Sequence, residues 1–454
     1  MRCPPPCSRT SVRFSELDGA RIGVWGAGRE ISSFADQLAR RLPSAQITVA
    51  AFDAPPAENV RETLRAPAAR IVTGPEAPAA LAECEVVVRS PGVSIYRPEL
   101  LALRDAGVPV TSATALWLAE RGGESVIGVT GTKGKSTTAA LAFHLARAAG
   151  RTAALAGNIG VPALDLLDAD PVDVTVLELS SYQIADLATG PEVALVTNLY
   201  REHTDWHGSE EAYRADKLRL LTLPGVRVRV VNGRDGRLTA AAGAGSSTFG
   251  TEGGWDASAE GITLRGETML ALEQLTLHGE HNALNLCAAL TALEALDVHA
   301  PALPDALRGF RPLPHRLETV AEQDGVLWVD DSISTTPESA LAALASFPGR
   351  HVVLIGGGQD RGQDYSELAR VLVGREASII GVPSTGRRLL AAAREAGVPD
   401  ARALEATDLA DAVELAREQA RAGGVVLLSP AAPSYDHYRD FEERGDRFHA
   451  LLSG

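Results

Sequence analysis

The chain has few cysteines, few aromatic residues and no long apolar run. Only four cysteines occur in 454 residues, and they lack metal-site spacing apart from one C-x₃-C. The apolar surroundings of Cys84 and Cys287 predict that both are core thiols, which fits a reducing cytoplasm. No apolar run reaches the ~18 residues of a membrane helix. The N-terminal segment lacks the apolar centre of a signal peptide. A net charge of −15 argues against a nucleic-acid or anionic-membrane surface.

The length predicts several domains, because one core rarely exceeds ~200 residues. Strands alternate with helices along nearly the whole chain, which predicts an α/β protein with mainly parallel sheets. We expect three domains, with boundaries near Ser112 and at the Pro-rich segment 310–314. The expected parts are a disordered tail (1–20), a Rossmann-like domain (21–112), a central P-loop domain (113–312) and a C-terminal Rossmann-like domain (313–454).

The most informative motif is a glycine-rich turn between a predicted strand, 125–129, and a predicted helix, 137–149. It reads GVTGTKGKST from Gly128 to Thr137. Such a turn points backbone N–H groups at phosphate, its lysine reaches the outer phosphates, and its Ser/Thr binds Mg²⁺. Val129 replaces one glycine of the strict motif, but a mere tight loop does not explain the following lysine and hydroxyls. The predicted nucleotide-binding residues are Gly131, Thr132, Lys133, Gly134, Lys135, Ser136 and Thr137.

The N-terminal part begins like a dinucleotide-binding unit. A predicted strand from Arg21 runs into Gly26-Ala27-Gly28, and the next strand ends at Asp53. Because Ile31 occupies the third glycine position, an NAD site is not expected, although another nucleotide can bind such a turn. A third strand stops at Ser90-Pro91-Gly92, at the strand end where α/β sheets bind ligands.

Eight motifs in order along the chain resemble the Mur ligase family, most closely its glutamate-adding members. They are GVTGTKGKST, GNIG (157–160), ELSSYQ (178–183), REHTDWH (201–207), YRADK (213–217), HNALN (281–285), PHRLE (314–318) and DDSISTTP (330–337). The resemblance implies an ATP-dependent ligase of peptidoglycan precursor synthesis. It implies ligation of glutamate to UDP-N-acetylmuramoyl-L-alanine through an acyl phosphate, with two Mg²⁺ ions.

The metal residues follow from position and from this resemblance. Glu178 ends a predicted buried strand, where a carboxylate completes the Mg²⁺ shell begun by Ser136 or, alternatively, caps a helix. From the residues alone, His203 is a solvated loop histidine and Lys217 a surface cation. The resemblance makes His203 a ligand of the second Mg²⁺ and Lys217 a carbamylated, carboxylate-like ligand. Carbamylation needs a neutral amine, so we expect Lys217 to be partly buried or near other cations.

The resemblance also implies the substrate contacts. Asn282 and Asn285 share one helix face and are placed against adenine and ribose, although they can instead flank the helix start. Arg316 is expected to stabilise phosphate charge, and Asp331 to meet the ribose. The residues implied for the UDP-sugar are Ala27, Gly28, Asp53, Ser90, Pro91 and Gly92, with Asn158, Ser180, Gln183 and His203 at the muramoyl-alanine end.

The predicted glutamate pocket departs from the D-glutamate enzymes of the family. Ile333 stands where their DSKxTN motif has lysine, and Arg361 replaces a second lysine. Guanidinium binds carboxylate bidentately in a plane, whereas ammonium acts as a point charge. The resemblance is therefore to the variant that adds L-glutamate, and D-glutamate is the alternative. The pocket residues are Ile333, Thr335, Arg361, Ser434 and Phe441.

Two further functions stay open at this point: a P-loop NTPase that does not ligate, and a non-catalytic nucleotide-binding regulator. The regulator is disfavoured because a non-catalytic protein has no need of a full metal site, whereas this chain has Lys135, Ser136, Glu178, His203, Lys217 and Asp331 together. ATP turnover that requires both a UDP-sugar and an amino acid would exclude the simple NTPase. We expect small-molecule substrates only, with no nucleic acid, no membrane and a monomeric chain.

Overall fold

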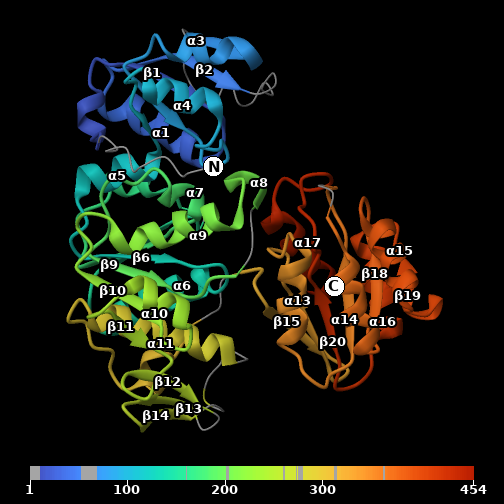
Figure 1. Ribbon diagram of the computed structural model, residues 1–454. Coiled ribbons are helices and arrows are strands. Elements are labelled where there is room, and N and C mark those ends of the chain that lie inside the picture. Colours follow the sequence, from blue (N-terminus) through green and yellow to red (C-terminus); the bar gives the residue numbers. More distant parts are fainter. Residues whose placement is uncertain are drawn as a thin grey trace. The chain divides into compact units, whose positions relative to one another are not determined.

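The computed structural model describes residues 11–52, 69–159, 161–200, 204–258, 261–271, 274, 280–310, 314–360 and 363–453. The chain forms two compact units, Met1–Phe310 and Arg311–Gly454. Figure 1 colours both along the sequence. The first unit contains two α/β sheets and a small antiparallel sheet, and the second contains one α/β sheet. The predicted α/β class with parallel sheets is confirmed.

The first sheet of the N-terminal unit has five parallel strands in the order β3-β2-β1-β4-β5. Buried aliphatic residues on alternate positions face helices on both sides, as expected for a parallel sheet. One side packs on α1 and the other on α3 and α4. The elements are η1 (Phe14–Leu17), β1 (Arg21–Trp25), α1 (Arg29–Arg41), β2 (Gln46–Phe52), β3 (Arg70–Thr73), η2 (Gly74–Glu76), α3 (Ala77–Leu81), β4 (Val86–Arg89), α4 (Pro98–Asp105) and β5 (Val110–Thr111).

The predicted disordered tail is wrong for residues 11–20. Phe14 and Leu17, three residues apart on the short helix η1, are both buried. Phe14 packs edge-to-face on Phe34 of α1, with ring centroids 6.4 Å apart. Burying two large apolar side chains orders the segment, and the Pro-rich start of the chain hid this signal. Residues 1–10 lie outside the described part.

The second sheet of this unit has six parallel strands in the order β11-β10-β9-β6-β8-β7. Its central strand β6 carries the glycine-rich turn, and α6 and α11 pack together beside it. The elements are α5 (Ala113–Arg121), β6 (Val126–Thr130), α6 (Lys135–Ala148), β7 (Ala153–Gly157), η3 (Ala163–Leu167), β8 (Val174–Glu178), α7 (Ser181–Ile184), β9 (Val193–Val196), α8 (Thr204–His207), α9 (Glu210–Leu218), η4 (Arg219–Thr222), β10 (Val228–Asn232), α10 (Gly236–Ala242), β11 (Ser247–Phe249), α11 (Glu280–Glu294) and α12 (Leu303–Ala306).

A small antiparallel sheet lies beside α11, and the sequence did not predict it. Its strands are β12 (Trp255–Ser258), β13 (Gly261–Leu264) and β14 (Glu267–Ala271). Trp255 is buried and its indole Nε1 donates to Glu294 of α11 at 2.9 Å. These strands are short and contain glycine and charged residues, so their periodicity was too weak to predict them.

The C-terminal unit is a six-stranded sheet in the order β15-β16-β20-β17-β18-β19, parallel except for β15. Helices α13, α14 and α15 cover one face, and α16 and α17 cover the other (Figure 1). The elements are β15 (Glu318–Gln323), β16 (Val326–Asp330), α13 (Pro337–Ala345), β17 (Val352–Gly356), α14 (Ser366–Gly374), β18 (Ser378–Gly381), α15 (Gly386–Ala396), η6 (Asp400–Arg402), β19 (Ala403–Glu405), α16 (Leu409–Gln419), β20 (Val425–Leu428) and α17 (Phe441–Ser453).

The division between the units, after Phe310, falls at the predicted Pro-rich boundary, whereas the boundary predicted near Ser112 lies inside the first unit. Among the described residues, no helix is both long and apolar enough to cross a membrane.

Candidate active site

The glycine-rich turn between β6 and α6 is a tightly packed cradle at the carboxyl edge of the central sheet. Gly131 has a φ of 145°, and a Cβ there would stand 1.9 Å from Oγ1 of Thr197. Gly134 has a φ of 80°, and its Cβ would stand 2.3 Å from Oδ1 of Asn285. Side chains at either position would collide with neighbouring groups. The turn therefore needs glycine to close, which leaves its backbone N–H groups at the start of α6 for an anion.

Asn198, which the sequence did not single out, holds this turn from outside. Its Oδ1 accepts from the backbone N of Lys133 at 2.8 Å, and its Nδ2 donates to the Lys133 carbonyl at 2.9 Å. Thr197 Oγ1 donates to the same carbonyl at 2.7 Å. Both residues follow β9, the neighbour of β6. A polar pair directly after a buried strand was the signal that could have identified them.

The predicted lysine and serine stand at the first turn of α6. Lys135 is half-buried, and its Nζ donates to the Thr132 carbonyl at 2.9 Å. Ser136 is buried at the next position. Asn285 lies beside this turn: its Oδ1 accepts from Thr138 Oγ1 at 3.3 Å, and its Nδ2 donates to Asn282 at 3.2 Å. Asn285 is thus next to the cradle, and Asn282 is hydrogen-bonded to Asn285.

Glu178 ends β8, the other neighbour of β6, and brings a carboxylate to the cradle. Its Oε1 accepts from Asn158 Nδ2 at 2.8 Å. Its Oε2 is buried and has no hydrogen-bond partner among the described residues. A buried carboxylate oxygen without a partner is costly, and a cation would remove that cost. This orphaned oxygen fits the predicted Mg²⁺.

Lys217 of α9 reaches the same turn from a third direction. The side chain is buried, and its Nζ donates to the Gly131 carbonyl at 2.8 Å. The ammonium also lies 4.9 Å from the ring centre of Tyr213. The Tyr213 hydroxyl is 2.9 Å from Thr132 Oγ1. The structure therefore places Lys217, predicted from sequence, against the glycine-rich turn.

The turns predicted to bind the UDP-sugar meet at the carboxyl edge of the first sheet. Strands β1 and β4 are neighbours, and the strand order reverses between them. Open α/β sheets bind ligands at such switch points. Ser90 Oγ donates to the Ala27 carbonyl at 2.8 Å and joins the two turns. Asp53, His203 and Arg361, also predicted site residues, lie outside the described part of the chain.

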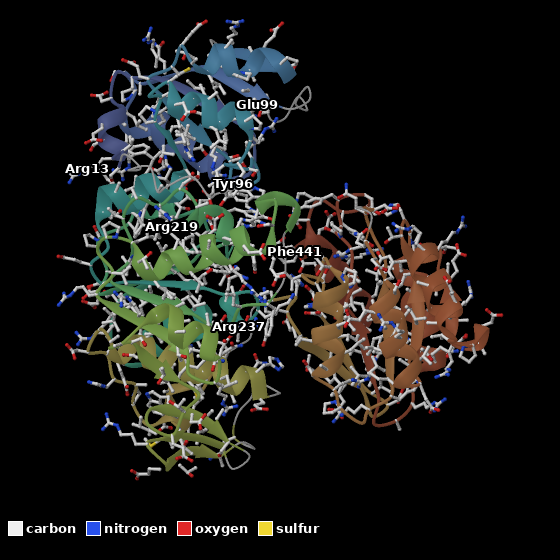
Figure 2. All side chains as sticks on the ribbon, viewed as in Figure 1. Arg13, Tyr96, Glu99, Arg219, Arg237 and Phe441 are labelled. Carbon is white, nitrogen blue, oxygen red and sulfur yellow. The ribbon has the colours of Figure 1, made fainter. Side chains whose placement is uncertain are left out.

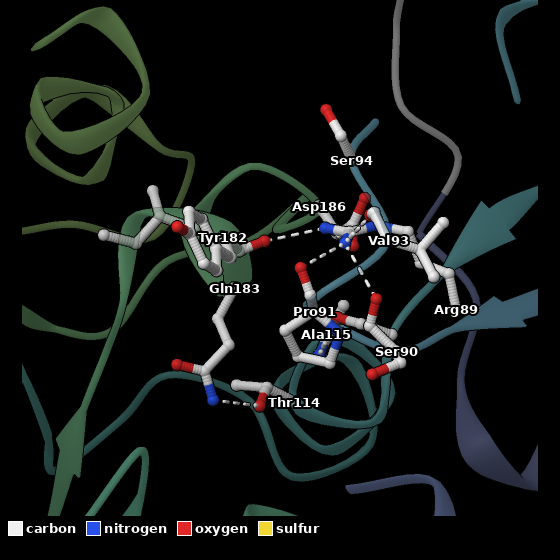
Figure 3. A network of polar contacts seen from close by, with 12 residues as sticks. Arg89, Ser90, Pro91, Val93, Ser94, Thr114, Ala115, Tyr182, Gln183 and Asp186 are labelled. Atoms are coloured by element: carbon white, nitrogen blue, oxygen red, sulfur yellow. Dashed lines mark hydrogen bonds and ion pairs between the residues drawn. The ribbon is translucent and has the colours of Figure 1, made fainter. Parts of the chain in front are cut away.

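A buried arginine holds the Ser90 turn in shape (Figure 3). Arg89 donates to the carbonyls of Ser90, Pro91 and Val93 at 3.1, 3.1 and 2.6 Å. Its guanidinium also pairs with the fully buried Asp186 at 2.5 Å and donates to the Tyr182 carbonyl at 2.7 Å. Arg89 is thus the hub between the first sheet and helix α7. An arginine at the end of an otherwise apolar strand was its only sequence signal.

Ser180 and Gln183, predicted at the muramoyl end, form the N-terminal cap of α7. The Gln183 Oε1 accepts from the backbone N of Ser180 at 2.8 Å, and its Nε2 donates to Thr114 at 3.2 Å. Nε2 also donates to Glu30, whose pKa burial raises. Gln183 is almost fully buried, so its amide serves this cap in the observed arrangement.

The predicted ATP and glutamate residues of the C-terminal unit gather where β16 ends. Asp331 accepts from Ser429 Oγ at 2.8 Å and from the backbone N of Leu317 at 3.3 Å. Burial raises its pKa to about 6. Arg316 lies in the turn that Asp331 holds. Ile333 and Thr335 follow β16 in the chain, and Ile333 N donates to the His315 carbonyl. Ser332 Oγ donates at 2.9 Å to the carbonyl of Phe441, which is labelled in Figure 2 at the start of α17. Ser434 is buried after β20.

Two imidazoles and two carboxylates converge beside Arg316. They belong to His315, Glu318, Asp330 and His449, and one potential ligand atom of each lies within 4.8 Å of the others. Asp330 Oδ2 is 2.7 Å from His315 Nδ1 and 2.8 Å from His449 Nε2. These are hydrogen-bond lengths, because two ligands of a four-coordinate zinc would stand roughly 3.3 Å apart. The cluster therefore acts as a hydrogen-bonded brace for the turn that carries Arg316.

Residues 129–293 match the Mur ligase middle domain, and residues 315–432 match the Mur ligase glutamate ligase domain. A relative from a Micromonospora species is 46% identical and covers 96% of this chain and 97% of its own. The chain belongs to the Mur ligase family. That relative is named UDP-N-acetylmuramoyl-L-alanine--L-glutamate ligase, as is one from Xanthomonas euvesicatoria with 43% identity over 98% of this chain and 97% of its own.

Solved Mur ligase folds also resemble this chain. MurF ligase from Thermotoga maritima in complex with ADP aligns with a TM-score of 0.56 and 17% identity, covering 98% of each chain. Folylpolyglutamate synthase from Mycobacterium tuberculosis, complexed with ADP and AMPPCP, aligns with a TM-score of 0.55 and 19% identity, covering 71% of this chain and 90% of its own. At these identities the likeness concerns the fold. The Mur ligase resemblance predicted from the eight motifs is confirmed.

The His315 brace predicts a pH-dependent stability for this Mur ligase. Burial alone would lower the pKa of His315, but the hydrogen bond and charge of Asp330, with Asp446 and Glu318, outweigh it and raise the pKa. Because the pKa of His315 is higher in the folded state, the protonated imidazole stabilises the fold. This stabilisation is complete below the pKa of the unfolded state, about 6.5, and is lost as the pH rises through the pKa of the folded state. His315→Gln should therefore unfold at a lower Tm than wild type near pH 6, and this difference in Tm should shrink as the pH rises to about 9.

His437→Gln is the matched control, because it removes a half-exposed imidazole from the same unit. Its difference in Tm from wild type should stay small at every pH. A His315→Gln difference that grows with pH would contradict the predicted direction.

Proposed function

We propose that this Mur ligase joins L-glutamate to UDP-N-acetylmuramoyl-L-alanine and converts ATP to ADP and phosphate, a step of peptidoglycan precursor synthesis. The observation that carries the proposal is the arrangement around one glycine turn. Lys135 begins the helix after this turn, Lys217 donates to the Gly131 carbonyl, and Glu178, with its orphaned Oε2, ends the strand that pairs with β6. The full-length relatives support the choice of substrates.

The donor set of this site suits Mg²⁺, which prefers oxygen ligands. Ser136 and Glu178 would hold one ion. His203 and a carbamylated Lys217 would hold a second. When bound, these ions supply charge neutralisation at the phosphates and the attacking carboxylate. The buried oxygen of Glu178, without a partner among the described residues, supports the first of these sites.

The chain's own residues mainly position and stabilise charge. The L-alanine carboxylate attacks the γ-phosphorus, the bond to ADP breaks, and an acyl phosphate forms. The glutamate amine then attacks the acyl carbon, loses a proton, and phosphate leaves as the amide forms. Backbone N–H groups of the turn and Lys135 hold the phosphates, and Arg316 stabilises charge on the transferred group. Asn158 and Ser180 would orient the muramoyl-alanine end.

We infer that the glutamate pocket selects the L enantiomer. Ile333 and Arg361 replace two lysines of the D-glutamate enzymes, and a guanidinium fixes the plane in which a carboxylate binds. Inverting Cα while the amine still faces the acyl phosphate misdirects one carboxylate, so one enantiomer should be strongly favoured. Arg361→Lys should lower kcat/KM for L-glutamate roughly 10–100-fold, because a charge-assisted bidentate contact is lost.

The test is ligation with D- and L-glutamate side by side, with ATP, Mg²⁺ and UDP-N-acetylmuramoyl-L-alanine present, read as dipeptide product. Arg388→Lys is the matched control, because this arginine binds Asp360 near the surface of the same unit. It should leave the enantiomer preference unchanged. A preference for D-glutamate would reject the stereochemical inference and leave the ligase intact. ATP turnover that needs neither co-substrate would favour the simple NTPase.

We further propose that the protein acts in the cytoplasm as a monomer on small molecules only. ATP and a UDP-linked sugar are available there, and every predicted site residue comes from one chain. Sedimentation of the purified enzyme with and without its substrates would test the monomer directly.

A further inference from the structure

A relay of four hydrogen-bonded side chains runs from the first sheet's turn into the central domain; it consists of Tyr96, Asp216, His207 and Ser181. The Tyr96 hydroxyl, labelled in Figure 2, donates to Asp216 Oδ2 at 2.7 Å. The same oxygen lies 2.8 Å from His207 Nδ1, and His207 Nε2 lies 3.0 Å from Ser181 Oγ. A carboxylate only accepts, so His207 Nδ1 carries a hydrogen.

The order Ser181, His207, Asp216 is that of a hydrolase triad, but its burial excludes that chemistry. These residues are 2%, 3% and 5% exposed. No substrate carbonyl can approach the Ser181 hydroxyl in this arrangement, and a nucleophilic serine needs that approach. The relay therefore has a positioning role.

The relay touches the elements that adjoin three of the four predicted magnesium ligands, namely Glu178, His203 and Lys217. Ser181 is the first residue of α7, three positions after Glu178. Asp216 directly precedes Lys217 in α9. His207 is the last residue of α8, the helix that follows His203 in the chain. Hydrogen bonds along the relay therefore hold α7, α8 and α9 at fixed spacing.

The other end of the relay belongs to the turn predicted to bind the UDP-sugar. Trp206 Nε1 donates to the Pro91 carbonyl at 3.1 Å, and Ser94 Oγ donates to the Trp206 carbonyl at 2.7 Å. The Trp206 indole also stacks on Tyr182, with ring centroids 4.4 Å apart. Trp206 thus joins the turn after β4 to α8 directly and to α7 through its ring, and the hydrogen bonds described above connect the turn to α9 only through Tyr96.

We propose that Tyr96, Asp216 and His207 are positioning residues that couple the nucleotide-sugar turn to the magnesium site. When the Tyr96 hydroxyl donates to Asp216, α9 and its Lys217 are held in the metal-binding position. When the turn moves, the relay loses its first donor and metal binding weakens. The identity of the sugar and of the metal rests on the proposed function. The coupling itself rests on the hydrogen bonds of the relay.

The decisive experiment measures Mn²⁺ affinity by electron paramagnetic resonance on the full-length chain with β,γ-methylene-ATP and without UDP-sugar or glutamate. Tyr96→Phe removes only the hydroxyl and keeps the ring that packs edge-on against Trp206. Its Kd for Mn²⁺ should rise about fivefold or more, a usual size for coupled sites. Ser94→Ala deletes an equally short hydrogen bond of the same turn and a longer one, 3.3 Å, from the backbone N of Tyr96, but it leaves the Tyr96 hydroxyl and its bond to Asp216 in place. Its Kd should stay within about twofold of wild type.

Asp216→Asn provides a second measurement. If the relay is one unit, adding Tyr96→Phe to Asp216→Asn should weaken Mn²⁺ binding no further than Asp216→Asn alone. The proposal would be overturned if the effects of Tyr96→Phe and Asp216→Asn multiplied in the double variant, or if Tyr96→Phe kept the wild-type Kd. It would also be overturned if Ser94→Ala weakened Mn²⁺ binding equally, or if the wild-type chain bound no Mn²⁺. Failure to ligate glutamate would reject the proposed function, and the Mn²⁺ affinities would still decide on the relay.

Discussion

Replacing Lys135 with alanine should lower kcat for ligation about 10²–10³-fold, the usual loss when one preorganised charge contact to a transition state is removed. The residue stands at the first turn of α6, and the closed glycine cradle fixes its backbone. Loss of the ammonium leaves negative charge on the outer phosphates uncompensated during transfer. Initial rates at saturating ATP and Mg²⁺ would measure the effect.

The control for Lys135→Ala is Arg147→Ala on the last turn of the same helix. Arg147 is exposed, and its guanidinium lies over the Phe143 ring, away from the cradle. Both variants should fold, as judged by unchanged circular dichroism, and only Lys135→Ala should lose turnover. Wild-type turnover in Lys135→Ala would show that the glycine turn does not bind the transferred phosphates.

Replacing Lys217 with alanine should lower kcat at least about 10²-fold, because the variant removes a proposed oxygen ligand from the metal site. Formate or acetate should restore part of the activity by occupying the vacated position. Lys217 has an alternative role, which is to hold the glycine-rich turn, because its unmodified ammonium donates to the Gly131 carbonyl. If Lys217 only held the turn, Lys217→Ala would still lose activity, but added carboxylates would not restore any of it.

Arg214→Ala is the matched control on α9, because it removes a cation that is 34% exposed and paired with Glu210 one turn away. Such pairs contribute little, so turnover should stay close to wild type. In the wild-type enzyme, ¹³C-labelled bicarbonate should give a carbamate carbon signal that Lys217→Ala lacks. Absence of this signal, together with no carboxylate rescue, would contradict carbamylation.

Local motifs were predicted well because neighbours in the chain define them. The turn from Gly131 to Gly134 lies between β6 and α6, where the apolar run and the glycines placed it. Strand ends were predicted from the same logic, since polar residues after a buried strand reach the carboxyl edge of a parallel sheet. Glu178 and Ser90 are examples.

Partners far apart in the sequence could not be predicted in this way. Tyr96 and Asp216 are 120 positions apart, and Arg89 donates to a carbonyl 93 positions away. Nothing in the spacing of a lone tyrosine, histidine or arginine distinguishes a buried hub from a surface residue. The hydroxyl of Ser181 and the carboxylate of Asp216 become a relay only when α7 and α9 pack side by side.

The sequence by itself determined the α/β class, the Mur ligase family and the glycine cradle, because strand-turn-helix structure is encoded in contiguous residues. It also supplied the residue types of the proposed metal site. Only the tertiary structure decided that Asn198 brackets the cradle, that Oε2 of Glu178 is buried without a partner, and that Lys217 contacts Gly131. These features depend on which strands are neighbours in the sheet. That choice is made by the burial of apolar faces over the whole unit, which no short segment specifies.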